Sequence, residues 1–351
     1  MRVRFFDPGK AYLAHKEEFD SEIQRVLTAG DLILRKDVEN FETNLSSYLG
    51  VRYAVGLNSG TDALELALRA LQIGRGDEVI TVSNTFKATI TSIMKVGAKP
   101  VLVDIGEDYL MDLDQLESRI GIKTRAIIPV HLSGDVCRMS LLTGMAGRNI
   151  DIIEDAAQAI GASSFDNKAG NWGTIGCFSF YPAKILGSFG DAGALVTREK
   201  NIADWVRNYR NHCKDIPGED GMNSRLDNLQ AAVLNVKLKY LDGYIKRRKV
   251  VADWYTLSFS GNPHIVCPTV RDVYQDYIIR IEARDALFDY LAKNEIETMK
   301  TPVLPHIELD LPFKLPKTEK YNKQFLRLPC NPELTDEQVH FVVEKVNEFY
   351  K

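Results

Sequence analysis

A single lysine stands in an apolar, glycine-rich stretch near the middle of this sequence. Residues 178–196 read FSFYPAKILGSFGDAGALV, and the one charge there besides Lys184 is Asp191. A lysine in dry surroundings has a lowered pKa, and its neutral amine can form a Schiff base with an aldehyde. The alternative is a lysine that reaches from a loop to water. Because so few charges surround Lys184, we expect it to be a nucleophile, with the nearby glycines leaving room for a ligand.

A second feature is a glycine turn that leads from a strand into a helix. Residues 58–71 read NSGTDALELALRAL, and their apolar side chains share one helical face. The backbone N–H groups of Gly60 and Thr61 would point outward at the positive end of the helix dipole, where phosphate binds. The alternative is an ordinary capping box formed by Ser59 and Asp62.

Two adjacent acids end one predicted strand, and an aromatic residue follows another. IEDAAQA, at 153–159, places Glu154 and Asp155 at the end of an apolar run. Ligands bind beyond the carboxyl ends of strands in open α/β sheets, so a carboxylate there can pair with a protonated ring nitrogen. The alternative is the acidic start of a helix. Phe86 follows another strand at the same edge, where its ring either stacks on a flat cofactor or joins the core.

Several common kinds of site do not fit the spacing of residues. GRGDEV at 74–79 lacks the third glycine of a dinucleotide fingerprint, and neither a P-loop nor an H-E-x-x-H motif occurs. The separation of Ser179 and Lys184 does not match S-x-x-K, and no G-x-S-x-G elbow is present. The five cysteines include no C-x-x-C pair, so we predict neither a zinc site nor a disulfide framework.

Short β-branched runs alternate with amphipathic stretches and predict an α/β fold. The expected helices at 15–29 and 36–49 end before glycines and precede this alternation. The pattern predicts a large domain with a mostly parallel central sheet flanked by helices. CFSFY and GALVT are two further strands on either side of Lys184. The expected strands before them are YAVGL at 53–57, EVITV at 78–82, KPVLVDI at 99–105, RAIIPV at 125–130 and IDIIED at 150–155.

The C-terminal part is predicted to form a smaller α+β domain. It contains the strand YIIRIEA, the helix RDALFDYLAKNE and a last helix opened by a capping box of Thr335 with Gln338. We expect the large domain to span 1–240 and the small one 241–351, with one long helix at about 225–258 as the bridge.

The charge balance excludes some partners. The 351 residues include 44 Lys and Arg against 48 Asp and Glu, which does not suit binding to nucleic acid or to an anionic membrane. MRVRFFDPGK has no apolar leader segment, and no window is long and apolar enough for a membrane span. We expect a cytoplasmic protein that acts on small molecules.

Read in order, the motifs resemble the DegT family of pyridoxal-phosphate-dependent sugar aminotransferases, which have fold type I. The resemblance runs in one register from about residue 5 to the C-terminus. It is carried by SGTDALELAL, GDEVITVSNTF, IIPVHLSG, IIEDAAQAIGA, GCFSFYPAK, GDAGALVT, NSRLDNLQAAVL and LPCNPELTDEQV.

The resemblance implies a role for each matching residue. Lys184 would hold pyridoxal phosphate and shuttle a proton, and Asp155 would pair with the pyridine nitrogen. Gln158 would hydrogen-bond the ring oxygen, and Phe86 would stack on the ring. The cofactor phosphate would be bound by Gly60, Thr61 and Ser179 and, from the partner subunit, Asn223.

The shared site implies a homodimer. Taken alone, Ser179 could be an ordinary strand hydroxyl and Asn223 the N-cap of the long helix.

The implied reaction is a transamination. An amino acid, most often L-glutamate, would give its amino group to the cofactor, so that pyridoxamine phosphate forms as the intermediate. The amino group then passes to a keto group of a dTDP-, UDP- or GDP-linked sugar in amino-sugar biosynthesis. The turn GDAG at 190–193 favours a 3-keto sugar. The alternatives are a C4 keto-sugar aminotransferase, a keto-cyclitol aminotransferase and a non-catalytic regulatory homologue. Lys184 argues against the dehydratases of the family, which carry histidine there.

Two segments depart from the pattern of the family on the expected substrate side. RNHC at 210–213 leads into CKDIPGEDG where many relatives read R-N-H-G, and KTPVLP at 300–305 replaces H-Y-P-x-P. We expect substrate contacts among five polar residues on segments that face the acceptor, although each could equally be a surface or interface residue: Tyr181, Arg210, His212, Arg225 and His306.

Overall fold

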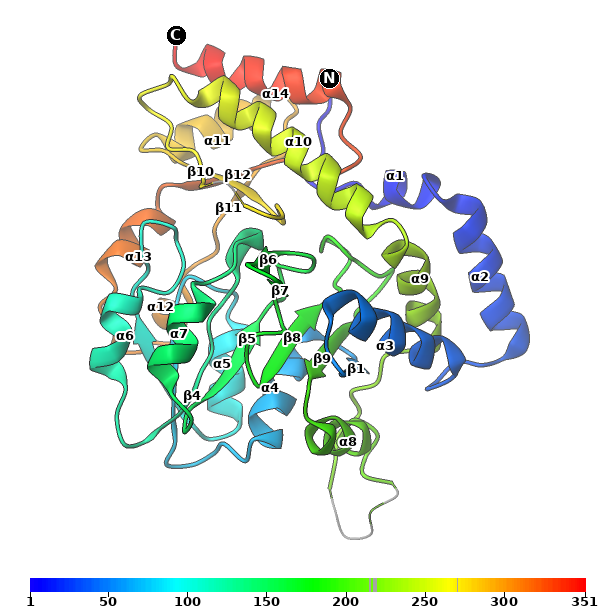
Figure 1. Ribbon diagram of the computed structural model, residues 1–351. Helices are drawn as coiled ribbons and strands as arrows, with labels where there is room; N and C mark the ends of the chain where they lie inside the picture. The colour runs from blue at the N-terminus through cyan, green and yellow to red at the C-terminus, as the bar shows by residue number, and fades with distance from the viewer. Residues whose placement is uncertain (215, 217–219, 270) are drawn as a thin grey trace.

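A seven-stranded sheet forms the centre of the molecule (Figure 1). The structure is a computed structural model that describes residues 1–214, 216, 220–269 and 271–351. The strand order is β1-β9-β8-β5-β4-β2-β3, and only β9 runs against its neighbours. The strands are β1 (Tyr53–Leu57), β2 (Glu78–Val82), β3 (Lys99–Val103), β4 (Thr124–Ile127), β5 (Asp151–Asp155), β8 (Ile175–Ser179) and β9 (Gly193–Thr197). The predicted mostly parallel sheet is confirmed.

Helices cover both faces of this sheet, because alternate residues of its strands are apolar on both sides. On β5, Ile152 packs into the core under α6 and α7, whereas Ile153 packs into the core under α4. The helices around the sheet are α3 (Lys36–Leu49), α4 (Gly60–Ala70), α5 (Ala88–Lys95), α6 (Leu113–Arg119), α7 (Met139–Ala146), α8 (Lys200–Tyr209) and α9 (Asn228–Leu238).

Shorter elements complete this part of the chain. Gly30 and Gly50 end α2 and α3 in the left-handed conformation, as expected of C-terminal caps. The elements are α1 (Pro8–Leu13), α2 (Lys16–Ala29), the 3-10 turn η1 (Leu132–Gly134) and the hairpin of β6 (Ser163–Ser164) with β7 (Asn167–Lys168).

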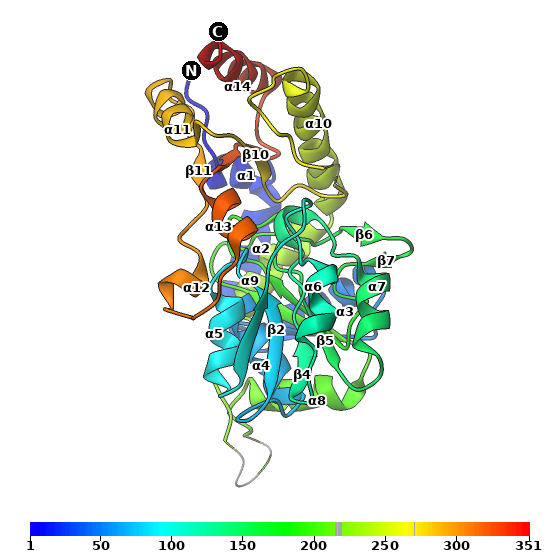
Figure 2. The ribbon, with the colours of Figure 1, turned by 90° about the vertical axis from the view of Figure 1, so that its left-hand side faces the viewer.

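The C-terminal segment builds a second core over a small antiparallel sheet, β10-β12-β11. Figure 2 shows both termini beside α14, and Val3 joins this core. Thr335 and Gln338 form the predicted capping box of α14. The division of the chain into two domains near residue 240 stays a prediction. The elements are α10 (Leu241–Phe259), β10 (Tyr277–Arg280), α11 (Arg284–Lys293), β11 (Met299–Lys300), α12 (Pro305–Glu308), α13 (Pro316–Asn322), β12 (Phe325–Leu328) and α14 (Asp336–Phe349).

The predicted single helix over 225–258 is wrong, because the chain breaks there into α9 and α10. Backbone bonds of the i to i+3 type tighten the end of α9, with the N–H of Tyr240 donating to Lys237. The Tyr240 ring stacks on His15, with centroids 3.8 Å apart, and its hydroxyl donates to Glu18. The chain therefore changes direction between α9 and α10 at the point where Tyr240 packs against the N-terminal segment.

No helix of the described residues is both long and apolar enough to cross a membrane.

Candidate functional site

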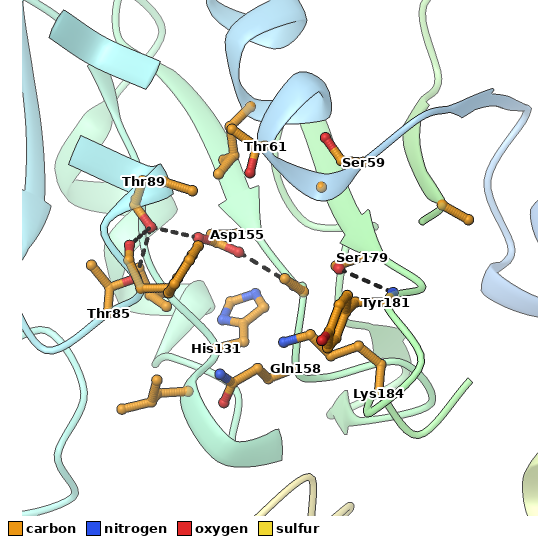
Figure 3. Close-up of a pocket in the computed structure, with 18 of the residues that line it drawn as sticks. Ser59, Thr61, Thr85, Thr89, His131, Asp155, Gln158, Ser179, Tyr181 and Lys184 are labelled. Atoms are coloured by element: carbon orange, nitrogen blue, oxygen red, sulfur yellow. Dashed lines mark hydrogen bonds between the residues drawn. The ribbon is translucent and has the colours of Figure 1, made fainter. Parts of the chain in front are cut away.

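A cavity of about 540 Å³ opens at the carboxyl edge of the large sheet (Figure 3). It lies where β1, β2, β4, β5 and β8 end, as the strand order of an open α/β sheet predicts. Among the residues named from the sequence, the cavity is lined by Gly60, Thr61, Phe86, Asp155, Gln158, Ser179, Tyr181 and Lys184.

The N-terminus of α4 forms one end of the cavity. Ser59 is the N-cap, and its side chain accepts a hydrogen bond from the N–H of Asp62. The N–H groups of Gly60 and Thr61 have no acceptor within the helix, because they belong to its first turn. A Cβ on Gly60 would lie 2.8 Å from the Cβ of Ser179, so only glycine lets β8 approach this turn.

Asp155 stands at the centre of the cavity wall as the last residue of β5. Its Oδ2 accepts from the Thr89 hydroxyl at 2.8 Å, and its Oδ1 accepts from the N–H of Ala157 at 3.3 Å. Burial raises the pKa of the Asp155 carboxyl, although both hydrogen bonds oppose this. No helix begins after β5 in this described segment, so the alternative of an acidic helix start is wrong.

Glu154 points away from the cavity and holds the fold together. It is fully buried and accepts hydrogen bonds from the N–H groups of Gly170, Trp172 and Gly173. His131 lines the cavity, and its Nε2 lies 2.8 Å from Glu154. The Nδ1 of His131 accepts from a backbone N–H, so Nε2 carries the proton that is donated to Glu154.

Gln158 and Phe86 face the space beside Asp155. The Oε1 of Gln158 accepts from the N–H of Ser133 at 2.7 Å, which fixes the amide at the cavity wall. The Phe86 side chain is 64% exposed, so this ring is not a core residue of the monomer. A flat ring between Phe86 and the opposite wall would cover it.

Lys184 lies in a tight turn between β8 and β9. Its N–H donates to Tyr181 at 2.8 Å, and burial lowers the pKa of its amine. A Cβ on Gly187 would lie 2.2 Å from the carbonyl oxygen of Pro182, so the turn requires glycine there.

Gln275 holds this turn on both sides of the lysine. Its Oε1 accepts from the N–H of Ile185 at 3.0 Å, and its Nε2 donates to the carbonyl of Ala183 at 2.9 Å. The backbone N–H of Gln275 donates to Ser133, which also holds Gln158. Two residues of the cavity, Lys184 and Gln158, are thus held through one short chain of hydrogen bonds.

Four of the polar residues proposed from the sequence lie outside the cavity. Arg210 is buried, and its Nη1 donates to Glu42 at 2.5 Å and to the carbonyl of Gly56 at 2.6 Å. His306 is also buried and lies 2.7 Å from the Ser83 hydroxyl through its Nδ1. In the single chain the polar atoms of Arg210 and His306 are thus engaged by the fold, and a contact of either residue with substrate stays a prediction.

The remaining residues lie on the segment before α9. Arg225 donates to Asn211 at 3.2 Å, and His212 and Asn223 are exposed. None of the three lines the cavity of its own chain. Because α9 begins at Asn228, Asn223 is not its N-cap. Part of CKDIPGEDG lies outside the described residues, so its place relative to the substrate stays a prediction.

Sequence reasoning missed three residues of this site: Thr89, His131 and Gln275. His131 follows a strand in IIPVHLSG, and that position at the carboxyl edge was an available signal. Thr89 lies one helical turn after Phe86, but nothing local pairs it with Asp155. Gln275 comes from a distant loop without regular structure, so only the tertiary fold brings it to Lys184.

Comparison with known proteins gives one consistent result. The family model described as the DegT/DnrJ/EryC1/StrS aminotransferase family matches residues 14–347. A relative named dTDP-3-amino-3,4,6-trideoxy-alpha-D-glucose transaminase, from Streptomyces venezuelae, is 39% identical, covering 99% of this chain and 96% of its own.

Two solved structures share the fold. DesV from S. venezuelae, in complex with a ketimine intermediate, has a TM-score of 0.96 at 40% identity and covers 100% of this chain and 99% of its own. NtdA from Bacillus subtilis, with bound cofactor PMP, has a TM-score of 0.92 at 30% identity and covers 99% of this chain and 85% of its own.

Proposed function

The chain belongs to the DegT/DnrJ/EryC1/StrS aminotransferase family and is a pyridoxal-phosphate-dependent transaminase, and we propose that it aminates a keto group of a nucleotide-linked sugar. One observation carries the proposal. The lysine amine, the buried carboxylate and the N-terminus of α4 converge on a single cavity. The amino donor is proposed to be L-glutamate.

The residues present fit pyridoxal phosphate. The turn at Gly60 leaves a cradle that a Cβ would fill, and the N–H groups of α4 suit a phosphate. The exposed face of Phe86 suits a flat ring. The carboxyl group of Asp155 suits a protonated ring nitrogen, because that positive charge would favour its ionised form. The amide of Gln158, held by Ser133, suits the ring oxygen.

When bound, pyridoxal phosphate supplies a carbonyl for the amino group and a ring that takes up electrons from the bonds that break. The chain orients this group through the phosphate cradle of α4 and Ser179. Asp155 would hold a proton on the ring nitrogen, and Phe86 would keep water from one face of the ring.

Lys184 is the proposed acid and base. Burial lowers the pKa of its amine, which favours the neutral form that can accept a proton. It would accept the proton from the carbon that bears the donor's amino group. In the second half of the reaction it would give a proton to the former keto carbon of the acceptor.

The acceptor is proposed to be a 3-keto sugar. The GDAG turn places Asp191 and Ala192 in the cavity wall, close to Lys184. The name of the Streptomyces relative, which specifies a 3-amino sugar, supports the same position on this chain's acceptor. The C4 position and keto-cyclitols are the alternatives that an assay must separate.

A homodimer with shared sites is part of the proposal. Asn223 is exposed and lies outside its own cavity, as expected if it reaches the cofactor phosphate of the partner chain. The exposure of Phe86 in a single chain is also consistent with a partner nearby.

Absorbance and paired assays test the function. The purified protein should show the visible band of the lysine-bound cofactor and lose it when L-glutamate is added. With glutamate present, the loaded protein should aminate 3-keto nucleotide sugars faster than 4-keto sugars or inososes. A protein that binds the cofactor without any half-reaction would instead be the regulatory homologue.

A further inference from the structure

Two threonine hydroxyls lie in line in the wall of the main cavity and lead to Asp155 (Figure 3). The hydroxyl oxygens of Thr85 and Thr89 are 2.7 Å apart, and that of Thr89 lies 2.8 Å from the Oδ2 of Asp155. Thr85 also lines a smaller cavity of about 70 Å³ beside Phe86 and Gln158. In the part of the chain that the structure describes, Thr89 is the one side chain that hydrogen-bonds Asp155.

The number of available protons sets the direction of these hydrogen bonds. The Thr89 oxygen also lies 3.2 Å from the carbonyl oxygen of Phe86, so it has three neighbours and a single proton to give. A carboxylate and a carbonyl can only accept. When Asp155 is ionised, Thr89 gives its proton to the nearer acceptor, Oδ2, and the contact with Thr85 then requires Thr85 to donate. The order of donation is therefore from Thr85 to Thr89 to Asp155.

This order matters because Asp155 is buried. The residue is 6% exposed, and burial raises the pKa of its carboxyl, whereas the hydrogen bond from Thr89 lowers it. A donated hydrogen bond favours the ionised form of an acid, and the ionised form is the one that can hold a proton on a ring nitrogen by charge. Thr89 thus opposes the loss of water around the carboxylate.

The same contacts fix how the carboxyl group is turned. Oδ2 is held by Thr89, and Oδ1 accepts from the N–H of Ala157 at 3.3 Å. Thr89 is fully buried in the first turn of α5, so its hydroxyl is offered from a fixed point. A carboxylate has about four acceptor positions on its two oxygens, so capacity remains for the N–H of a bound ring.

We propose that Thr89 is a positioning residue for the cofactor, which keeps Asp155 ionised and oriented toward the pyridine nitrogen, and that Thr85 fixes the direction of the Thr89 hydroxyl. The inference rests on the role proposed for Asp155 and names the side chains that support it. The alternative is a threonine that only stabilises the start of α5 through the carbonyl of Phe86. In that case the ring nitrogen would not matter.

The test removes single hydroxyl groups. Thr89→Val keeps the branched shape without the hydroxyl, and Thr89→Ser keeps the hydroxyl without the methyl group. Thr81→Val is the matched control, because Thr81 is also fully buried and its hydroxyl donates to the carbonyl of Ile128 at 2.8 Å. Thr81 lines neither of the two cavities that Thr85 lines. Thermal unfolding compares how far Thr89→Val and Thr81→Val destabilise the fold.

Two measurements report on Asp155. The first is the Kd of the apoprotein for pyridoxamine phosphate, which binds without a bond to Lys184. The second is the single-turnover rate of the loaded protein with L-glutamate. We expect Thr89→Val to raise the Kd and to lower the rate by about tenfold each, as loss of one hydrogen bond to a charged group would. Thr89→Ser should stay close to the wild type, and Thr81→Val should leave both values unchanged.

A second comparison shows whether Thr89 acts through Asp155. In an Asp155→Asn background, Thr89→Val should cause no further loss of affinity for pyridoxamine phosphate, since the group that it supports is gone. An analogue of pyridoxamine phosphate with carbon in place of the ring nitrogen should bind equally to the wild type and to Thr89→Val. A threonine that only shapes the pocket would weaken the binding of both ligands by the same factor.

Several results would overturn the inference. Wild-type affinity in Thr89→Val would do so, as would an equal loss in the Asp155→Asn background or a Thr89→Ser variant as impaired as Thr89→Val. If Thr89→Val does not fold, Thr85→Val decides: it should weaken the binding of pyridoxamine phosphate but not of the carbon analogue, and any other result contradicts the idea.

Failure of the proposed function would look different. Unchanged affinity and rate in Asp155→Asn would refute the role proposed for Asp155 itself. A protein that shows the expected effects of Thr89→Val but aminates no sugar would lose the proposed acceptor and keep the assignment of Thr89. A protein that does not react with L-glutamate would lose the proposed donor, and the Kd for pyridoxamine phosphate would still test the threonine.

Discussion

Burial favours the uncharged form of both titratable groups at the centre of the cavity. The pKa of the Lys184 amine is lowered and that of the Asp155 carboxyl is raised, in each case mainly by loss of water. A neutral amine suits attack on a carbonyl. A protonated ring nitrogen beside Asp155 would reverse the effect on the carboxyl by adding an opposite charge.

Replacing the lysine gives the first prediction. Lys184→Ala should abolish transfer and the visible cofactor band while leaving the fold intact, because the turn is held by backbone groups and by Gln275. Activity, absorbance and thermal unfolding measure this. An exposed lysine changed in the same way, Lys36→Ala, is the control. Measurable turnover in Lys184→Ala would exclude the assigned role.

Gln275 is predicted to position Lys184. Gln275→Ala should reduce kcat by about tenfold to a hundredfold, since small misplacements of a reacting group have effects of that size. The pH at which the visible band changes should also move, because the freed turn alters the surroundings of the amine. Gln275→Glu keeps an acceptor for Ile185 but loses the donor to Ala183, so an intermediate effect is expected. An unchanged kcat and pH profile in Gln275→Ala would contradict this role.

Which site residues could be predicted depended on where their partners lie. Asp155 and Ser179 end strands and Phe86 follows one, so their meeting at one edge follows from the alternation of strands and helices. The burial of Arg210 and His306 could not be predicted, because their partners, Glu42 and Ser83, are far away in sequence. A polar side chain on a loop looks the same in sequence whether it faces a ligand or a buried acceptor.

At the scale of elements, α9 contacts the glycine-rich turn between β8 and β9 through one buried lysine. Lys237 is 8% exposed, and its Nζ donates to the carbonyl of Gly187 at 2.6 Å. Burial lowers the pKa of Lys237 to about 8. The helix and the turn that carries Lys184 are therefore linked by a group that titrates near working pH.

This link predicts a pH dependence of stability. Between about pH 8 and 10.5 the unfolded chain binds a proton at Lys237 that the native state does not, so the free energy of unfolding rises with pH. Relative to Lys237→Met, the wild type should gain stability with a slope that approaches about 1.4 kcal/mol per pH unit in the middle of this range. Denaturant unfolding at pH 7.5, 8.5 and 9.5 checks the slope. Lys36→Met, at an exposed lysine, should run parallel to the wild type.

Strands were easier to predict than helix ends. β1, β2 and β9 have the predicted bounds, because a buried strand is a continuous apolar run between polar turns. The break between α9 and α10 left no such mark, since the residues around it favour helix locally. It accompanies contacts of Tyr240 with α2 and with His15, which no local pattern reveals. α8, at Lys200–Tyr209, was missed altogether.

At the scale of the whole molecule, the shared site can be tested by mixing defective chains. We expect the Lys184→Ala variant and the Asn223→Ala variant each to have low activity on its own when the concentration of pyridoxal phosphate is limiting. If Asn223 serves the partner, a mixed dimer has one intact site, and random mixing should restore about a quarter of wild-type activity. No gain on unfolding and refolding the two together would mean that Asn223 acts within its own chain or not at all.

The place of β9 between β1 and β8 also bears on how the protein is made. β1 pairs with β9, from Tyr53 opposite Thr197 to Leu57 opposite Gly193, so the first strand of the sheet in chain order pairs with the last. Ser59 and Gly60 can face Ser179 only after this distant pairing, which is slow to form because it closes a long loop. During synthesis, we therefore expect the phosphate cradle to form only after β9 has left the ribosome. Premature termination before that strand should release a polypeptide without the phosphate cradle.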